Sequence, residues 1–172
     1  VQHARDKNDS KAVSALLTLK PHAVDGLAVG PLIYWDRIPP DQPTAARVDS
    51  IDEVILGAHA AYLKDPVEVL GEVFHIHHDD KTSESNFDTL GFYLQGAYQT
   101  GSFKPYLRFD YLDVANADPY FTGARRLDRT KYTLGLRWDV VKWNALKFEY
   151  GYTDRQTSDQ DHAFTVNSSF LF

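Results

Sequence analysis

Nine segments of this sequence alternate apolar and polar side chains with the two-residue period of a β-strand, and turn residues separate them. No stretch of useful length shows the period of a helix. The segments lie near residues 11–21, 27–36, 51–64, 67–78, 87–100, 103–114, 131–141, 145–153 and 163–172. This pattern predicts an all-β fold, an antiparallel up-and-down barrel that forms one domain over residues 1–172.

The connections between these segments alternate in length. Short links at 22–26, 65–66, 101–102 and 142–144 alternate with long polar links at 37–50, 79–86, 115–130 and 154–162. Short turns on one rim and long loops on the other are typical of a barrel that crosses a membrane. No run of about 18 apolar residues occurs, which excludes a transmembrane helix, whereas a barrel strand needs only about 9 to 11 residues of alternating polarity. We therefore expect a transmembrane β-barrel.

The two faces of the expected strands differ in chemistry. Along 131–140 the even positions are apolar or aromatic, and the odd positions are Lys, Thr, Gly, Arg and Asp. Large rings stand toward strand ends, as in the aromatic girdle of a membrane protein, which directs the apolar face outward. These rings are Trp35, Tyr98, Tyr111, Trp138 and Tyr152. The residues then predicted to line the lumen are Lys104, Arg108, Asp110, Arg137, Asp139, Lys147, Glu149, His59 and Glu72.

The outward positions predict the register of the hairpin at 101–102. Outward residues are even-numbered before this turn and odd-numbered after it, so the turn must contain an even number of residues. A two-residue Gly-Ser turn of type II′ satisfies this condition, because glycine supplies the positive φ. It places Leu94 opposite Phe109 on the outer side and Tyr93 opposite Asp110 in the lumen.

The hairpin at 142–144 has even-numbered outward residues on both sides, so its turn must be odd in length. A three-residue turn sets Asp139 opposite Lys147 and Arg137 opposite Glu149. A slip of two residues in either direction would face like charges, which cross-strand energetics disfavour. We therefore expect opposite charges to pair across these strands.

Composition excludes several classes of function. The chain has no cysteine, so neither a disulfide framework nor a thiolate metal site is available. Its formal net charge of −6 and lack of a basic stripe argue against nucleic acid as a partner. The first residues lack the basic start and apolar core of a signal peptide, which indicates a mature or truncated chain. We expect no cofactor.

The sequence gives little support to a metal site or a catalytic centre. Residues 75–80 offer imidazole and carboxylate ligands, but they run into an expected loop, so a solvated strand end is the favoured interpretation. Asp110, Asp139 and Glu149 invite a comparison with acid/base pairs, yet no serine has a neighbouring His and Asp pattern. A small basic cluster in the longest loop is either solvated or folded inward: Arg125, Arg126 and Arg129.

The last segment carries the most specific signal. Phe164, Val166, Phe170 and Phe172 share one face of it. This arrangement resembles the closing strand of outer-membrane barrels, whose terminal aromatic residue and alternate apolar residues are recognised by the barrel-assembly machinery. The resemblance implies that these four residues form the assembly signal, with an ordinary amphipathic edge strand as the other interpretation.

Segments 104–110, 135–139 and 146–150 also resemble the last hairpins of Gram-negative outer-membrane porins of the phosphate-selective type. The resemblance to porins covers nearly the whole chain. It implies a channel in the bacterial outer membrane for passive diffusion of small polar or ionic solutes, and not an enzyme. It also implies contact with outer-membrane lipid and allows a homo-oligomer.

Single-chain bacterial barrels have an even number of strands and both termini in the periplasm, whereas this sequence has about nine strand segments. We therefore interpret the chain as the C-terminal part of a longer polypeptide, whose pore has about 12 to 18 strands. Two alternatives remain open. One is a small eight-stranded membrane barrel, filled by side chains and structural or adhesive in role; the other is a soluble ligand-binding barrel.

Overall fold

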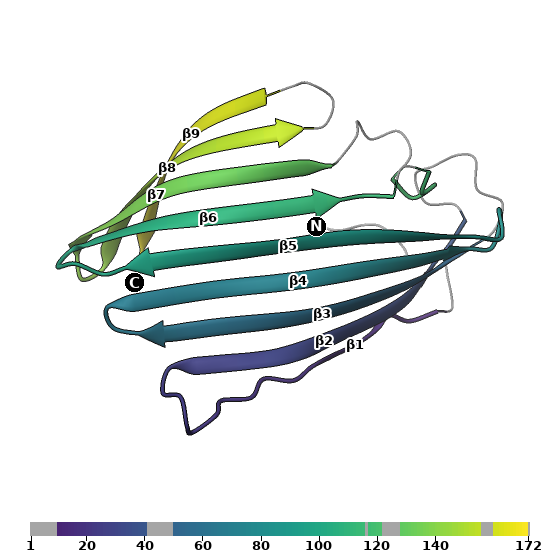
Figure 1. Cartoon of the computed structure of the whole chain (residues 1–172), viewed down its shortest axis with the longest axis horizontal. Coiled ribbons are helices and arrows are strands. Elements are labelled where there is room, and N and C mark those ends of the chain that lie inside the picture. The colour runs from purple at the N-terminus through teal and green to yellow at the C-terminus, as the bar shows by residue number, and fades with distance from the viewer. Residues whose placement is uncertain (1–9, 41–49, 116, 122–127, 156–159, 172) are drawn as a thin grey trace.

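The computed structural model describes residues 10–40, 50–115, 117–121, 128–155 and 160–171. They form one antiparallel sheet in which each strand pairs only with its neighbours in the chain (Figure 1). The strands are β1 (Val13–Leu16), β2 (Leu27–Ile38), β3 (Ile51–Lys64), β4 (Val67–Asp80), β5 (Ser85–Tyr98), β6 (Phe103–Asp113), β7 (Arg129–Val141), β8 (Asn144–Arg155) and β9 (Gln160–Phe170). The expected all-β, up-and-down architecture is confirmed.

The sheet is open and curved. Among the described strands, β1 pairs only with β2 and β9 only with β8, so each has a free edge. Figure 1 shows these edge strands bending behind the central ones. Tight turns join β3 to β4, β5 to β6 and β7 to β8 at one end, and the connection from β6 to β7 lies at the other. We call these the turn end and the loop end.

Within the described residues, no helix has the length and apolar character needed to cross a membrane.

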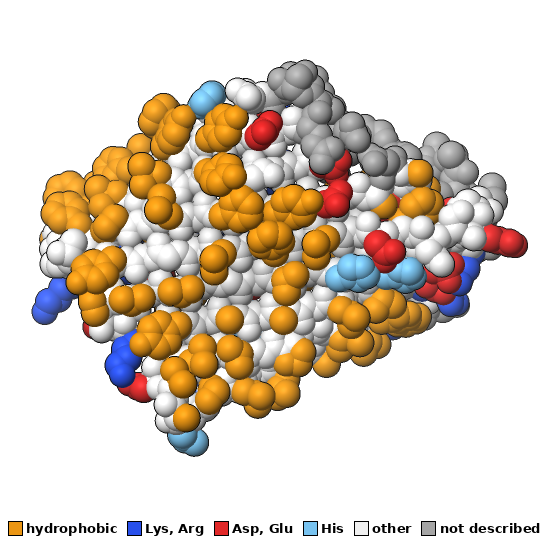
Figure 2. All heavy atoms as spheres, viewed as in Figure 1, with side chains coloured by type: hydrophobic (Ala, Val, Ile, Leu, Met, Phe, Trp, Pro, Cys, Tyr) orange, Lys and Arg blue, Asp and Glu red, His pale blue; other side chains and the backbone are white. Residues whose placement is uncertain are grey.

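The two faces of the sheet have opposite chemistry. Large apolar side chains are exposed on one face, with Leu94 56%, Leu107 66% and Leu134 57% exposed, and Figure 2 shows such side chains spread over the sheet. Most charged side chains of β6, β7 and β8 occupy the other face, whereas Arg37, Asp52 and Asp88 stand on the apolar side at the loop end. On the polar face, Lys104 Nζ of β6 lies 2.9 Å from Glu68 Oε2 of β4, across the intervening β5. Contacts between strands two apart require a concave surface, so the polar face is the inner one.

The five rings predicted as a girdle all stand on the convex face, by their register with apolar neighbours. Tyr98 and Trp138 lie near the turn end, and Trp35, Tyr111 and Tyr152 lie nearer the loop end. Aromatic side chains also meet across strands on this face, as with Phe109 and Tyr132, whose centroids are 5.2 Å apart. The exposed apolar band is therefore bordered by rings at both ends.

Two elements differ from the sequence prediction. β1 is only four residues long, although the chain still follows β2 to an isolated bridge between Leu19 and Val29. The carbonyl of Leu17 passes so close to Gly30 that an added Cβ there would lie 1.7 Å from it. The expected long loop at 79–86 is a four-residue turn instead, since β4 and β5 extend to Asp80 and Ser85. The Asp80 carboxylate closes this turn by accepting a hydrogen bond from the Ser83 hydroxyl at 2.7 Å.

The predicted register of the β5–β6 hairpin is confirmed. Leu94 faces Phe109 and Tyr93 faces Asp110. Thr100 and Phe103 form the closing bridge, which leaves two residues in the turn. The φ angle is positive at Gly101, 57°, and not at Ser102, as a type II′ turn requires of its two central residues.

The predicted register of the β7–β8 hairpin is wrong by two residues. Arg137 faces Lys147, and Asp139 faces Ala145. The turn contains two residues rather than three, because Val141 pairs with Asn144, and a bulge between Asp139 and Val141 restores the alternation of faces. The prediction that the turn must be odd in length is therefore wrong, because the alternation of faces does not distinguish a three-residue turn from a two-residue turn plus a bulge.

The like-charge pair is tolerated because the charges pair along each strand. Arg137 Nε lies 2.7 Å from Asp139 Oδ1, and Lys147 Nζ lies 3.0 Å from Glu149 Oε1. Residues two apart on a strand share a face, so each cation has a carboxylate neighbour that does not depend on the register. Charge pairing therefore failed to select the register that we expected.

Gly135 marks a close approach on the inner face. The Tyr106 ring lies over it, so that an added Cβ would stand 1.8 Å from the ring atom Cζ. The Tyr106 hydroxyl donates a hydrogen bond to Glu149 Oε1 at 2.6 Å, which ties β6 to β8 across β7. Tyr106 is one of the few buried apolar residues of the described chain, at 6% exposure.

Replacing Gly135 with alanine is expected to lower the free energy of unfolding by about 1–3 kcal/mol, the usual cost of overpacking, because Tyr106 must move and release Glu149. Urea unfolding followed by tryptophan fluorescence measures the change. Gly96→Ala is the matched control, since an added Cβ there meets no atom within 4 Å. Equal destabilisation by both variants would show that Tyr106 is not held by Gly135.

Candidate functional site

The candidate site is the polar, concave face of the sheet. All nine residues predicted to line a lumen lie on it: His59, Glu72, Lys104, Arg108, Asp110, Arg137, Asp139, Lys147 and Glu149. Alternation places them there without exception, because each shares the parity of its inward neighbours along its strand. Their role as pore-lining residues remains a prediction.

Ion pairs and a ring contact organise this face. The Arg108 guanidinium lies 2.6 Å from Asp110 Oδ1 and stands over the Tyr93 ring, 3.9 Å from its centroid. Lys147 Nζ lies 5.1 Å from the centroid of Tyr106. These cations keep both a carboxylate and an aromatic neighbour, so their positions are fixed by two different interactions.

The segment that follows β6 docks on this face at the loop end. His78 of β4 and Asp118 of the segment are both 1% exposed, and His78 Nδ1 lies 2.6 Å from Asp118 Oδ2. On its other side, His78 Nε2 lies 2.7 Å from Glu53 Oε2 of β3. The imidazole therefore joins three elements: β3, β4 and the segment after β6, of which residues 114–115 and 117–121 are described.

The His78 site holds an additional proton. An ionised carboxylate accepts hydrogen bonds but donates none, whereas a neutral imidazole has only one N–H. Both ring nitrogens lie within hydrogen-bond distance of Asp118 and Glu53, so the site contains one proton more than a neutral ring between two carboxylates. Removal of this proton at alkaline pH is expected to weaken the docking, because the docked state is the one that binds it.

Several further contacts hold the docked segment. Val114 N donates to Asp128 Oδ1 at 2.7 Å, and Ala115 N donates to the hydroxyl of Thr89 at 3.4 Å. The Phe121 ring stacks on His78 with centroids 5.7 Å apart, and Tyr120 meets His78 edge-on. The segment thus crosses β5 to reach β4 and narrows the concave face at the loop end.

Sequence reasoning missed the role of His78, which it grouped with its neighbours as a solvated strand end. The signal in the sequence was the alternation of faces, because odd-numbered and even-numbered residues of β4 point to opposite sides of the sheet. His75 and His77 lie on the convex face, where both are near Asp88 Oδ1, at 3.3 Å and 2.8 Å. His78 points to the opposite face and is buried there. Within the described part of the chain, no group of three or more His, Cys, Asp or Glu is arranged to hold a metal ion.

The predicted assembly signal falls on the free edge strand. Phe164, Val166 and Phe170 are 84%, 66% and 55% exposed on the convex side of β9. Phe172 lies outside the described residues, as do Arg125 and Arg126 of the basic loop cluster. Arg129 is the first residue of β7.

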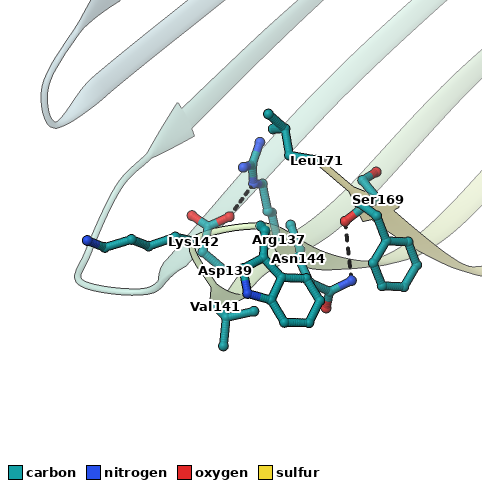
Figure 3. Close-up of a pocket in the computed structure, with 10 residues that line it drawn as sticks. Arg137, Asp139, Val141, Lys142, Asn144, Ser169 and Leu171 are labelled. Atoms are coloured by element: carbon teal, nitrogen blue, oxygen red, sulfur yellow. Dashed lines mark hydrogen bonds and ion pairs between the residues drawn. The ribbon is translucent and has the colours of Figure 1, made fainter.

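A hollow of about 360 Å³ lies at the turn end, between β7, β8 and the end of β9. Figure 3 shows Arg137 and Asp139 facing each other at its edge, and Lys142 extending away from it. The Asn144 side chain donates to the Ser169 carbonyl at 3.2 Å, and the Trp143 ring stacks on Phe170, with centroids 6.4 Å apart. These contacts fix the end of β9 to the β7–β8 turn.

Asp118→Ala is expected to release the docked segment, because removing one partner of a buried ion pair costs about 3–5 kcal/mol. Hydrogen exchange at the Phe121 amide reports this opening, because that amide donates to the backbone carbonyl of Asp118 and not to the carboxylate that is removed. The matched control is Asp88→Ala, which removes an exposed carboxylate beside His77 and should cost less than about 1 kcal/mol. Unchanged exchange in Asp118→Ala would rule out His78 as the anchor.

Comparisons with known proteins define the fold but not a family. No protein-family model matches the sequence. No curated protein matches it either. Among solved structures, the chain is similar to OmpT, an outer membrane protein of Vibrio cholerae folded in vitro and solved in its trimer form, with a TM-score of 0.64 and 17% sequence identity. The match covers 92% of this chain and 54% of that one, so the chain spans about half the length of its structural neighbour. The fold is therefore similar to that of an outer-membrane β-barrel protein.

Proposed function

We propose that this chain forms part of the wall of a transmembrane β-barrel in the bacterial outer membrane, a water-filled pore for passive diffusion of small polar or ionic solutes. The observation that carries the proposal is the polarity of the sheet, with apolar side chains exposed on the convex face and ion-paired side chains on the concave face. A soluble barrel has the opposite polarity. Lipid is the solvent that suits an exposed apolar band bordered by rings.

The free edges of β1 and β9 point to further strands. In a bilayer every backbone N–H and C=O must be paired within the protein, so an open edge is not stable there. We infer that additional strands close the barrel, from the same polypeptide or from another copy of it. The exposed Phe164, Val166 and Phe170 make β9 the candidate contact for the barrel-assembly machinery.

Cysteine labelling in proteoliposomes tests the orientation. Leu107→Cys is expected to react poorly with a membrane-impermeant maleimide although Leu107 is 66% exposed, because lipid covers it. Arg137→Cys is expected to react readily from the lumen. The reverse orientation would place arginine in lipid at about 2–4 kcal/mol near the midplane. Fast labelling of Leu107→Cys together with slow labelling of Arg137→Cys would contradict the proposal.

Planar-bilayer recordings test the pore itself. The purified protein is expected to conduct with weak ion selectivity, because cations and carboxylates both line the concave face. Arg137→Glu should shift the reversal potential toward cations, since it replaces a lumenal cation with a carboxylate. Trp143→Phe, at the turn between β7 and β8, is the control that changes no charge. A folded, inserted protein that does not conduct would favour a filled barrel instead.

A further inference from the structure

Polar side chains interrupt the apolar convex face at the loop end, where Figure 2 shows histidine and acidic side chains gathered together. His75 and His77 of β4 lie on this face, and Asp88 of β5 stands beside them. His75 Nε2 lies 3.3 Å from Asp88 Oδ1, and His77 Nδ1 lies 2.8 Å from the same oxygen. All three side chains are exposed. We call the two imidazoles that share this carboxylate the histidine pair.

Exposed apolar side chains flank the histidine pair on the neighbouring strands. Leu56 of β3 and Leu90 of β5 both face His75. Trp35 of β2 lies in the same transverse row as His77, two strands away, and is also exposed. Polar rings set among exposed apolar side chains suit a ligand that is polar at one end and apolar at the other.

The depth of the histidine pair in a membrane follows from its position along the strands. An outer-membrane barrel has an apolar band about 25 Å tall and strands tilted by about 35–45°. At about 3.4 Å per residue, a strand crosses such a band in about ten residues. That number separates Val67, at the start of β4, from His77, and it also separates Tyr98 of the ring girdle from Asp88. The histidine pair therefore lies where the hydrocarbon meets the lipid headgroups.

The other charged groups of this border are paired or distant. Arg37 Nε of β2 lies 2.6 Å from Asp52 Oδ1 of β3. Lys81 Nζ lies 3.5 Å from Asp52 Oδ2 and also pairs with Asp79. Asp113 of β6 stands two strands from β4, about 10 Å away, which exceeds the Debye length of about 8 Å at physiological salt. An anion at the histidine pair is therefore governed mainly by the two imidazoles and Asp88.

Protonation decides what the histidine pair offers to a ligand. An ionised carboxylate only accepts hydrogen bonds, so the ring nitrogen that faces Asp88 carries a proton. In a neutral ring the other nitrogen is then an acceptor, whereas in a protonated ring it is a second N–H donor. Within the described chain, no hydrogen bond or ion pair engages His75 Nδ1 or His77 Nε2. Two protonated rings around one carboxylate therefore present two free donors and a net positive charge.

We propose that the histidine pair, when protonated, binds the phosphate group of an anionic membrane lipid, whose acyl chains lie against Leu56, Leu90 and Trp35. A phosphate oxygen is a charged acceptor and forms charge-assisted hydrogen bonds with N–H donors. The inference rests on the proposed function only in requiring that the convex face meets lipid. It adds a lipid of defined headgroup chemistry and a pH dependence for its binding, because histidine gains its second proton between about pH 8 and 5.

Quenching of tryptophan fluorescence by brominated lipids tests this inference, because Trp35 lies beside the site. Trp138→Phe and Trp143→Phe leave Trp35 as the only tryptophan. Proteoliposomes receive a minor fraction of brominated phosphatidylglycerol or of brominated galactosyl diacylglycerol, which has no phosphate. The measured quantity is the ratio of quenching by the two lipids. It should be roughly two- to fivefold higher at about pH 5 than at about pH 8, because exposed charge pairs contribute on that order.

Replacing both rings separates the histidine pair from a general attraction for anions. His75→Gln combined with His77→Gln should remove the rise of the ratio at low pH, because glutamine is polar and stays neutral. His162→Gln is the matched control and should keep the rise. His162 also lies on the convex face near the loop end, but on β9, where its Nδ1 lies 2.7 Å from the Tyr150 hydroxyl.

Three outcomes would contradict these expectations. A ratio that does not change with pH, or that rises equally in the double variant, would overturn the lipid site. Loss of the preference when inorganic phosphate replaces chloride at equal ionic strength would also overturn it, because the site would then hold free phosphate. Absence of quenching by both lipids would contradict the proposed function itself, since Trp35 would not face lipid.

Discussion

The backbone hydrogen-bond ladder is the interaction on which this structure depends. The sheet has no second layer among the described residues, and its few buried apolar residues include Ile38, Ile51 and Tyr106. Side-chain burial therefore stabilises the chain less than it does in a sandwich or a bundle. Backbone hydrogen bonds between consecutive strands supply the remaining stability. They form readily because every connection returns the chain beside the strand it has just left. For the same reason, an open sheet edge would be unstable in a bilayer, where every backbone N–H and C=O must be paired within the protein.

Backbone geometry also outweighs charge in setting the register. Exposed cross-strand charge pairs contribute roughly 0.2–1 kcal/mol, which is no more than a single backbone hydrogen bond of a hairpin. At the β7–β8 hairpin, the short turn and the bulge determine the pairing, and Arg137 then faces Lys147. The cations keep carboxylate partners because Asp139 and Glu149 follow two residues later on the same strands. The charged side chains of this face therefore do not determine the register of the hairpin.

The concave face combines two structural features. The docked segment narrows its loop end, where His78 is held between Asp118 and Glu53. Toward the turn end, ion pairs within single strands line the same face, as with Arg108 and Asp110 and with Lys147 and Glu149. The convex face instead carries the band of exposed apolar side chains.

Alternation in the sequence determined most of the fold, because a period of two assigns each residue to a face whatever the strand pairs with. The strands, the up-and-down order, the inward position of all nine predicted lining residues and the Gly101-Ser102 hairpin followed from it. The bulge near Val140 did not, since turn lengths that differ by a bulge leave the same alternation in the sequence. Nor did the docking of Asp118 on His78, which lie 40 residues apart and carry no local pattern that relates them. Only the tertiary structure decided these two features, because each depends on where the backbone passes in space rather than on which face a side chain occupies.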